Sequence, residues 1–129
     1  LDPWDLKIVP GGLLDIEFIA QYLCLRWSRA HPDLVHSDTQ QVLLHAEHLG
    51  LLSADASEKL LSAHRLYTDF SQMSRICIEG PFQPDEVEEG IRKRLANATG
   101  LPDFKQLELA LSEAREKVRQ IYDETISGL

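Results

Sequence analysis

Cysteine is scarce in this chain, which contains only Cys24 and Cys77 among its 129 residues. Both lie in segments with helical periodicity, and neither their number nor their spacing fits a disulfide framework or a zinc site. We therefore expect two buried free thiols and a protein of the reducing cytoplasm.

Long apolar runs are missing as well. No run approaches the roughly 18 to 20 residues that a membrane-spanning helix needs, and no signal peptide can be read. The chain begins at Leu1, and Met73 is its only methionine. We therefore expect a piece of a longer protein that has no membrane partner.

Basic residues are outnumbered by acidic ones. The chain has 13 Lys and Arg against 21 Asp and Glu, which gives a net charge of -8. Binding to a nucleic-acid backbone relies on clustered Lys and Arg, so this balance argues against a nucleic-acid partner. A hydrophobic content of 43% is ordinary for a globular domain.

The motifs of common catalytic centres are absent. There is no Walker loop, no zinc spacing, no Ser/His/Asp order, and no Gly-Ser turn followed by Asp-x-Asp, the pattern that holds Mg²⁺ for nucleotidyl transfer. Asp15 and Glu17 come nearest to the Asp-x-Asp pattern. However, residues two apart on a helix diverge by about 200° and cannot chelate one ion together. His45 and His48 lie three apart, yet the sequence places no third ligand beside them. We expect neither a metal site nor a catalytic residue here.

Helical periodicity dominates what is present, and no alternating strand-like run of useful length follows residue 9. The spacing predicts an all-α fold of about five helices in an antiparallel bundle, preceded by a short extended segment. The predicted helices cover residues 13–28, 37–49, 53–78, 85–99 and 103–128. The expected caps are Ser37 with Gln40, Ser53, Asp85, and Asp103 with Gln106.

The clearest break in the pattern is Gly80-Pro81-Phe82-Gln83-Pro84. We expect one helical domain over residues 1–129. Within it, the break separates a core at 1–80 from a C-terminal helical pair at 84–128.

The stretch from Trp4 to Trp27 organises the chain. Its first residues alternate, because Trp4, Leu6 and Ile8 are apolar while Lys7 is polar, and this predicts an extended segment with Lys7 on its open side. After Pro10-Gly11-Gly12, the apolar positions predict a helix from Leu13 that is buried on most sides. A narrow polar stripe remains on it, at Glu17, Gln21, Cys24 and Ser28.

The Gly-Gly turn has two interpretations. Two glycines at the positive end of a helix leave backbone N–H groups open, and Lys7 can reach the same place, so a phosphate would fit. Alternatively, Gly12 is a structural N-cap, Asp15 completes the cap, and Lys7 is solvated or paired with Asp15. The spacing alone leaves both open.

The same stretch resembles a known family. The pattern K-x3-GG-x2-DIEF-x2-Q is similar to the signature of the helical domain that follows each nucleotidyltransferase domain in glutamine synthetase adenylyltransferase. The continuation YLCLRW, His31-Pro32 and the later LGLLS are similar too, so the resemblance covers about residues 4 to 80. It looks more like the C-terminal, adenylylating half. The residues of the pattern are Lys7, Gly11, Gly12, Asp15, Ile16, Glu17, Phe18 and Gln21.

This resemblance implies a function for the parent protein. Such an enzyme uses ATP and Mg²⁺ to place AMP on a tyrosine of glutamine synthetase, and also removes it, under a PII-type nitrogen-signalling protein. The chain would be an accessory domain beside an upstream nucleotidyltransferase domain, inactive alone. The alternative is a free-standing helical interaction module without enzyme activity. The resemblance implies these residues near the nucleotide or its phosphates: Lys7, Gly11, Gly12, Asp15, Glu17 and Gln21.

Overall fold

The computed structural model describes residues 2–126, and within this range α-helices and two short 3₁₀ turns are the regular secondary structure. The all-α class with five helices is confirmed. The helices are α1 (Leu13–Trp27), α2 (Thr39–His48), α3 (Ala54–Cys77), α4 (Glu89–Ala98) and α5 (Phe104–Ile126).

Two of the expected helix caps are confirmed. The Ser53 hydroxyl accepts a hydrogen bond from the Ala56 N–H at 3.1 Å and begins α3. The Asp103 carboxylate accepts one from the Gln106 N–H at 2.8 Å and begins α5. Each bond satisfies a backbone donor that has no partner inside its helix, which sets the helix start.

Two other expected caps are wrong. The cap of α2 is Asp38 rather than Ser37, and its carboxylate accepts from the Gln40 N–H at 3.0 Å. Asp85 does not begin α4, because it lies in the 3₁₀ turn Pro84–Glu86, and α4 begins after Glu88. The Arg92 guanidinium donates to the Pro84 carbonyl and ties this turn to α4.

The expected extended segment before α1 is also wrong, because residues 3–12 form successive turns. The Val9 N–H donates to the Asp5 carbonyl at 3.2 Å. Leu6 and Val9, three residues apart, are the buried pair, while Ile8 is 51% exposed. The spacing of the buried apolar residues is therefore close to the helical period and differs from the alternation of a strand.

The interpretation of α1 as buried on most sides needs correction as well. Ile16, Ile19 and Leu23 are buried, but Phe18 is 46% and Leu25 is 85% exposed. The outer face of α1 therefore carries large apolar side chains beside the exposed Gln21 and Arg26.

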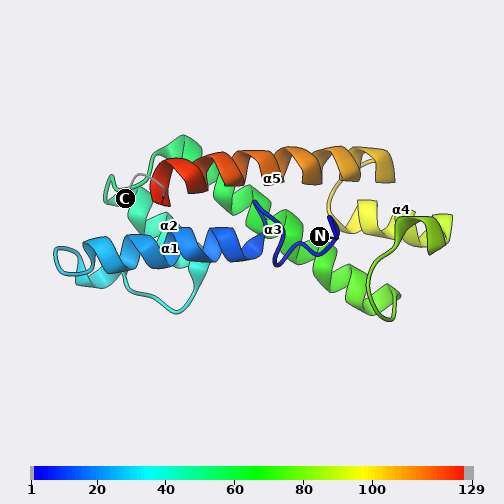
Figure 1. Ribbon diagram of the computed structural model, residues 1–129, viewed down its shortest axis with the longest axis horizontal. Helices are drawn as coiled ribbons and strands as arrows, with labels where there is room; N and C mark the ends of the chain where they lie inside the picture. Colours follow the sequence, from blue (N-terminus) through cyan, green and yellow to red (C-terminus); the bar gives the residue numbers. More distant parts are fainter. Residues whose placement is uncertain (1, 127–129) are drawn as a thin grey trace.

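All five helices contribute buried side chains to the core, most of which come from α1, α3 and α5. α5 packs against α1 and α3, and α2 packs against α1 and α3. In Figure 1, α1 and α5 lie along the long axis and run in the same direction, whereas α3 crosses them in the opposite direction. α3 therefore runs against both at an oblique angle, and the expected antiparallel arrangement of the bundle stays a prediction. The largest fully buried side chains of these three helices include Tyr67, Phe70, Ile16, Ile19, Leu60, Leu107, Leu111 and Val118.

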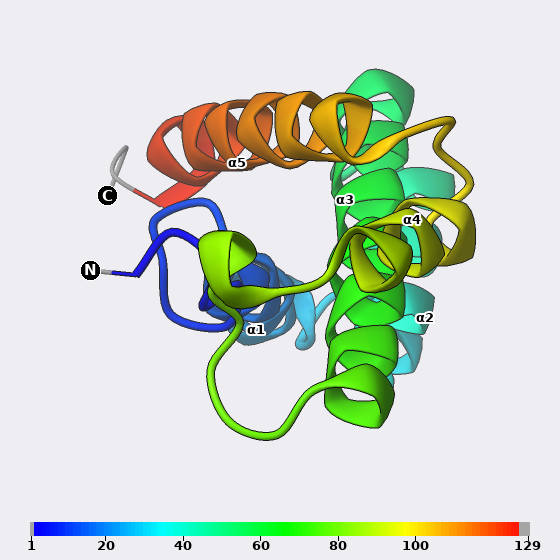
Figure 2. The ribbon, with the colours of Figure 1, turned by 90° about the vertical axis from the view of Figure 1, so that its right-hand side faces the viewer.

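An aromatic cluster joins the N-terminal turns to the C-terminal half. The Trp4 ring lies 5.6 Å from Phe70 of α3, 4.8 Å from Phe82 and 5.5 Å from Phe104 of α5, measured between centroids. Phe82 belongs to the segment that crosses in front of α1 and α3 on the way to α4 (Figure 2). Aromatic pairs at these distances stabilise the fold beyond the burial of their area.

The isolated chain should therefore unfold in one cooperative thermal transition with a strongly helical circular dichroism spectrum, since α5 and the aromatic cluster share the core with α1 and α3. Two separate transitions would instead support independent units at 1–80 and 84–128. That division stays a prediction, and residues 127 and 128 lie outside the described range.

Candidate functional site

The Gly-Gly turn lies where α1, α3 and α5 meet. Gly11 has a φ of +80°, which favours glycine, and Gly12 is the N-cap of α1, as one interpretation of the sequence expected. The Gly11 N–H donates to the Asp15 carboxylate at 2.6 Å, and the Tyr67 hydroxyl of α3 donates to the Gly11 carbonyl at 2.8 Å. Both polar groups of Gly11 are thus satisfied inside the fold.

Close packing is a second reason for the glycines. A Cβ atom on Gly11 would lie 2.0 Å from the carbonyl oxygen of Arg115 in α5. A Cβ atom on Gly12 would lie 2.2 Å from the carbonyl oxygen of Leu6. Because both obstacles are backbone atoms, neither can move aside as the end of a flexible side chain can.

Asp15 connects this turn to α5. Its buried carboxylate accepts from the Arg119 guanidinium at 3.1 Å, and Arg119 also pairs with Asp123 at 3.4 Å. The hydrogen bond to Asp15 raises the pKa of Arg119, so the guanidinium stays charged. The partner of Asp15 is therefore Arg119 rather than Lys7. We call Gly11, Gly12, Asp15, Tyr67 and Arg119 the Gly11 network.

Tyr67 and Arg119 are the members of this network that the sequence did not suggest. Tyr67 lies in the helix predicted at 53–78 without a role assigned to it, and Arg119 is 104 residues from Asp15. Burial raises the pKa of Tyr67 above its ordinary value, so the phenol remains protonated and can donate to Gly11.

The backbone donors of the turn are already in use. The Gly12 N–H donates to the Val9 carbonyl at 2.8 Å, the Leu13 N–H to Leu6 at 2.7 Å, and the Leu14 N–H to Lys7 at 3.0 Å. An anion-binding helix N-terminus needs such donors free. The turn therefore serves the fold, and Lys7, whose side chain is exposed, is the group beside it that remains open to a ligand.

Glu17 and Gln21 lie in a different place. They line a groove of about 510 Å³ between α1 and residues 35–39, which we call the α1 groove. Glu17 is half-buried and Gln21 is exposed. The groove is also lined by Cys24, Leu25, Val35 and His36. Burial raises the pKa of the Cys24 thiol, which makes it a weaker nucleophile.

The residues present do not fit a Mg²⁺ site. The Asp15 carboxylate is bonded to Gly11 and Arg119, whereas Glu17 lines the α1 groove. His45 and His48 lie with ring centroids 6.4 Å apart. Within residues 2–126, no three His, Cys, Asp or Glu side chains are arranged to hold a metal ion. In the same range, no helix combines the length and apolar composition needed to cross a membrane.

These features define an all-α domain in which the Gly11 network joins the turn before α1 to α3 and α5. A family model described as GlnD PII-uridylyltransferase matches residues 2–126, and the chain therefore belongs to this family.

Individual relatives confirm the resemblance seen in the signature. The chain is 41% identical to the bifunctional glutamine synthetase adenylyltransferase/adenylyl-removing enzyme of Bradyrhizobium sp. strain BTAi1, over 94% of its length. It is 39% identical to the enzyme of that name from Bradyrhizobium diazoefficiens, over 98% of its length. It is 38% identical to the one from Xanthobacter autotrophicus, over 95% of its length. The chain spans only 12 to 13% of these relatives.

Gly11→Ala should destabilise the fold by about 3 kcal/mol or more, because it combines left-handed strain with a backbone clash. Gly50→Ala is the matched control: its φ is +78°, but nothing lies within 4 Å of the added Cβ. It should cost only about 1 to 2 kcal/mol. Urea unfolding followed by circular dichroism measures both. Equal losses in the two variants would show that the approach of Arg115 does not constrain Gly11.

Proposed function

We propose that this chain is the helical accessory domain of a bifunctional glutamine synthetase adenylyltransferase/adenylyl-removing enzyme, from its C-terminal, adenylylating half. The observation that carries the proposal is the 38 to 41% identity to enzymes of that name over nearly the whole chain. The free-standing interaction module has no comparable support.

The full enzyme would transfer AMP from ATP to a tyrosine of glutamine synthetase and so regulate nitrogen assimilation in the cytoplasm. ATP and Mg²⁺ would be held by the upstream nucleotidyltransferase domain, since the residues of this chain do not fit the metal. A PII-type protein would control the enzyme. The acidic balance of the chain, 21 Asp and Glu against 13 Lys and Arg, agrees with protein partners and no nucleic acid.

The domain would contribute a rigid surface beside the nucleotide. The Gly11 network joins α1, α3 and α5, so the turns that carry Lys7 are fixed to the core. We place Lys7 next to the phosphates, where an exposed ammonium group stabilises the charge that develops during transfer. Glu17 and Gln21 belong to the α1 groove, and Gly11, Gly12 and Asp15 act by holding the turn.

A second candidate is uridylyl transfer, which the description of the family model favours. The names of the individual relatives favour adenylyl transfer instead. The two candidates differ in the nucleotide that is consumed and in the protein that is modified.

The full-length enzyme should incorporate label from [α-³²P]ATP into glutamine synthetase and none from labelled UTP. The isolated chain should incorporate neither, because its described residues hold no group of three His, Cys, Asp or Glu side chains that could bind a metal ion. Labelling of glutamine synthetase by the isolated chain, above a control without enzyme, would overturn the accessory role. Transfer from UTP alone would establish the uridylyl candidate.

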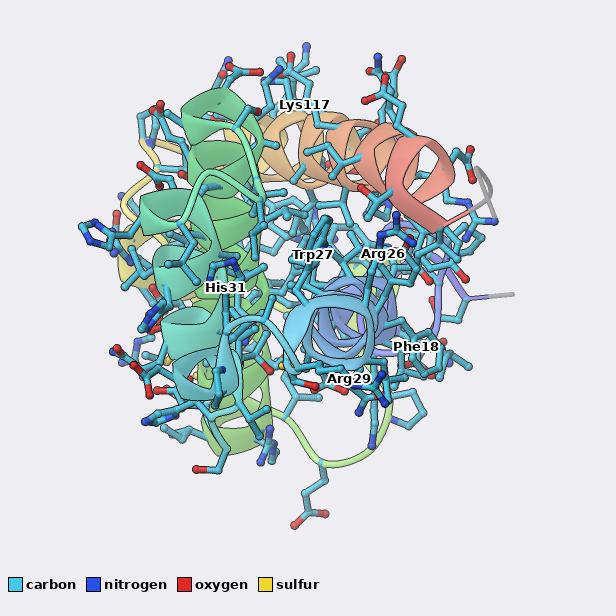
Figure 3. All side chains as sticks on the ribbon, turned by 90° about the vertical axis from the view of Figure 1, so that its left-hand side faces the viewer. Phe18, Arg26, Trp27, Arg29, His31 and Lys117 are labelled. Carbon is cyan, nitrogen blue, oxygen red and sulfur yellow. The ribbon has the colours of Figure 1, made fainter. Side chains whose placement is uncertain are left out.

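Lys7→Ala in the full-length enzyme should lower kcat for AMP transfer about 30- to 1000-fold, the equivalent of about 2 to 4 kcal/mol of lost transition-state stabilisation. The melting temperature should not change, because an exposed lysine contributes little to stability. Lys117→Ala is the matched control, since Lys117 projects from α5 into solvent (Figure 3) and should leave kcat unchanged. A Lys7→Ala enzyme that melts earlier but keeps its kcat would show that the lysine is structural.

A further inference from the structure

The outer face of α1 carries two large, exposed apolar side chains, Phe18 and Leu25, with the exposed Gln21 between them in the sequence. Phe18 is 46% exposed and Leu25 is 85% exposed, and Val35, which lines the α1 groove together with Leu25, is 61% exposed. Figure 3 shows Phe18 on the side of α1 away from α2 and α3. The α1 groove, with about 510 Å³ of space, adjoins this face and shares Leu25 with it.

Two charged side chains border the face at opposite ends. Glu17, in the first half of α1, lines the groove and is half-buried. Arg29 follows the C-terminal end of α1 and is exposed (Figure 3). Neither forms an ion pair or a hydrogen bond with another residue in the range 2–126. A half-buried carboxylate without a cationic partner is stabilised when a positively charged side chain binds beside it.

The size of the face indicates what covers it. α1 has 15 residues. It is therefore about 22 Å long, and one face about 10 Å wide is on the order of 200 Å². A stable interface between separate proteins buries roughly 800 Å² on each partner. A small face is sufficient when its partner belongs to the same polypeptide, because the effective concentration is then about millimolar.

We propose that the outer face of α1 is a docking surface for another segment of the same enzyme polypeptide, outside residues 1–129. This segment carries a large apolar side chain for the groove, a basic residue next to Glu17 and an acidic residue next to Arg29. The inference rests on the proposed function, because it requires that the chain be part of a longer enzyme. The chain spans only 12 to 13% of its relatives, which have room for such a segment. Because Glu17 and Arg29 lie at opposite ends of α1, the order of the basic and acidic residues in the segment fixes the direction in which it lies along the helix.

Photo-crosslinking of the full-length enzyme tests this docking. p-Benzoylphenylalanine in place of Leu25 should be tolerated, because that side chain is 85% exposed. After irradiation, peptide mass spectrometry should find intramolecular crosslinks to one segment with the stated pattern of residues. The same group in place of Leu109, a 52% exposed residue of α5, is the control and should not reach that segment. Crosslinked pairs of enzyme molecules, or no crosslink at Leu25, would overturn the proposal.

The charge pairing at Glu17 is tested with a second variant in the same crosslinking experiment. Glu17→Lys should lower the crosslink yield about tenfold, equivalent to about 1.4 kcal/mol. Glu108→Lys, which reverses an exposed acid on α5, should leave the yield unchanged. Equal yields in the two variants would overturn the pairing at Glu17.

AMP transfer, measured in the same samples, separates the two proposals. An enzyme that transfers AMP without the crosslink overturns the docking alone. One that forms the crosslink but modifies no glutamine synthetase overturns the proposed function alone.

Discussion

The buried carboxylate of Asp15 holds three parts of this fold together. It accepts from the Gly11 N–H in the turn before α1 and from Arg119 in α5, and Tyr67 of α3 donates to the carbonyl of the same glycine. A buried charge without partners is costly, so the carboxylate constrains the turn and α5 to stay where both can reach it. The approach of the Arg115 backbone to Gly11 depends on the same arrangement, and with it the contact of α1 with α5.

This network separates the residues of the signature into two groups. Gly11, Gly12 and Asp15 point into the fold, where the turn uses its backbone donors for internal carbonyl groups. Lys7 and Glu17 lie outside it. A sequence pattern that suggests a phosphate site thus has glycines and an aspartate whose polar groups stabilise the packing of a helical domain.

The outer face of α1 and the lysine beside the turn give the two proposals separate physical bases. Lys7 would act on a negatively charged substrate through one exposed charge. The face of α1 would act through apolar contact, with Glu17 and Arg29 setting its direction. Both depend on a rigid core, because a docking surface or a charge that moves with a loose helix loses part of its binding energy to ordering.

The sequence by itself determined the helical class, the start of α1 at Gly12, the caps Ser53 and Asp103, and the family. These features depend on local periodicity and on side chains that bond a few residues away. It did not determine the turns of residues 3–12, the caps of α2 and α4, or the exposure of Phe18 and Leu25. Only the tertiary structure paired Asp15 with Arg119 and brought the backbone of Arg115 against Gly11. Such contacts depend on how helices far apart in the sequence pack, and the spacing of residues along the chain does not determine that packing.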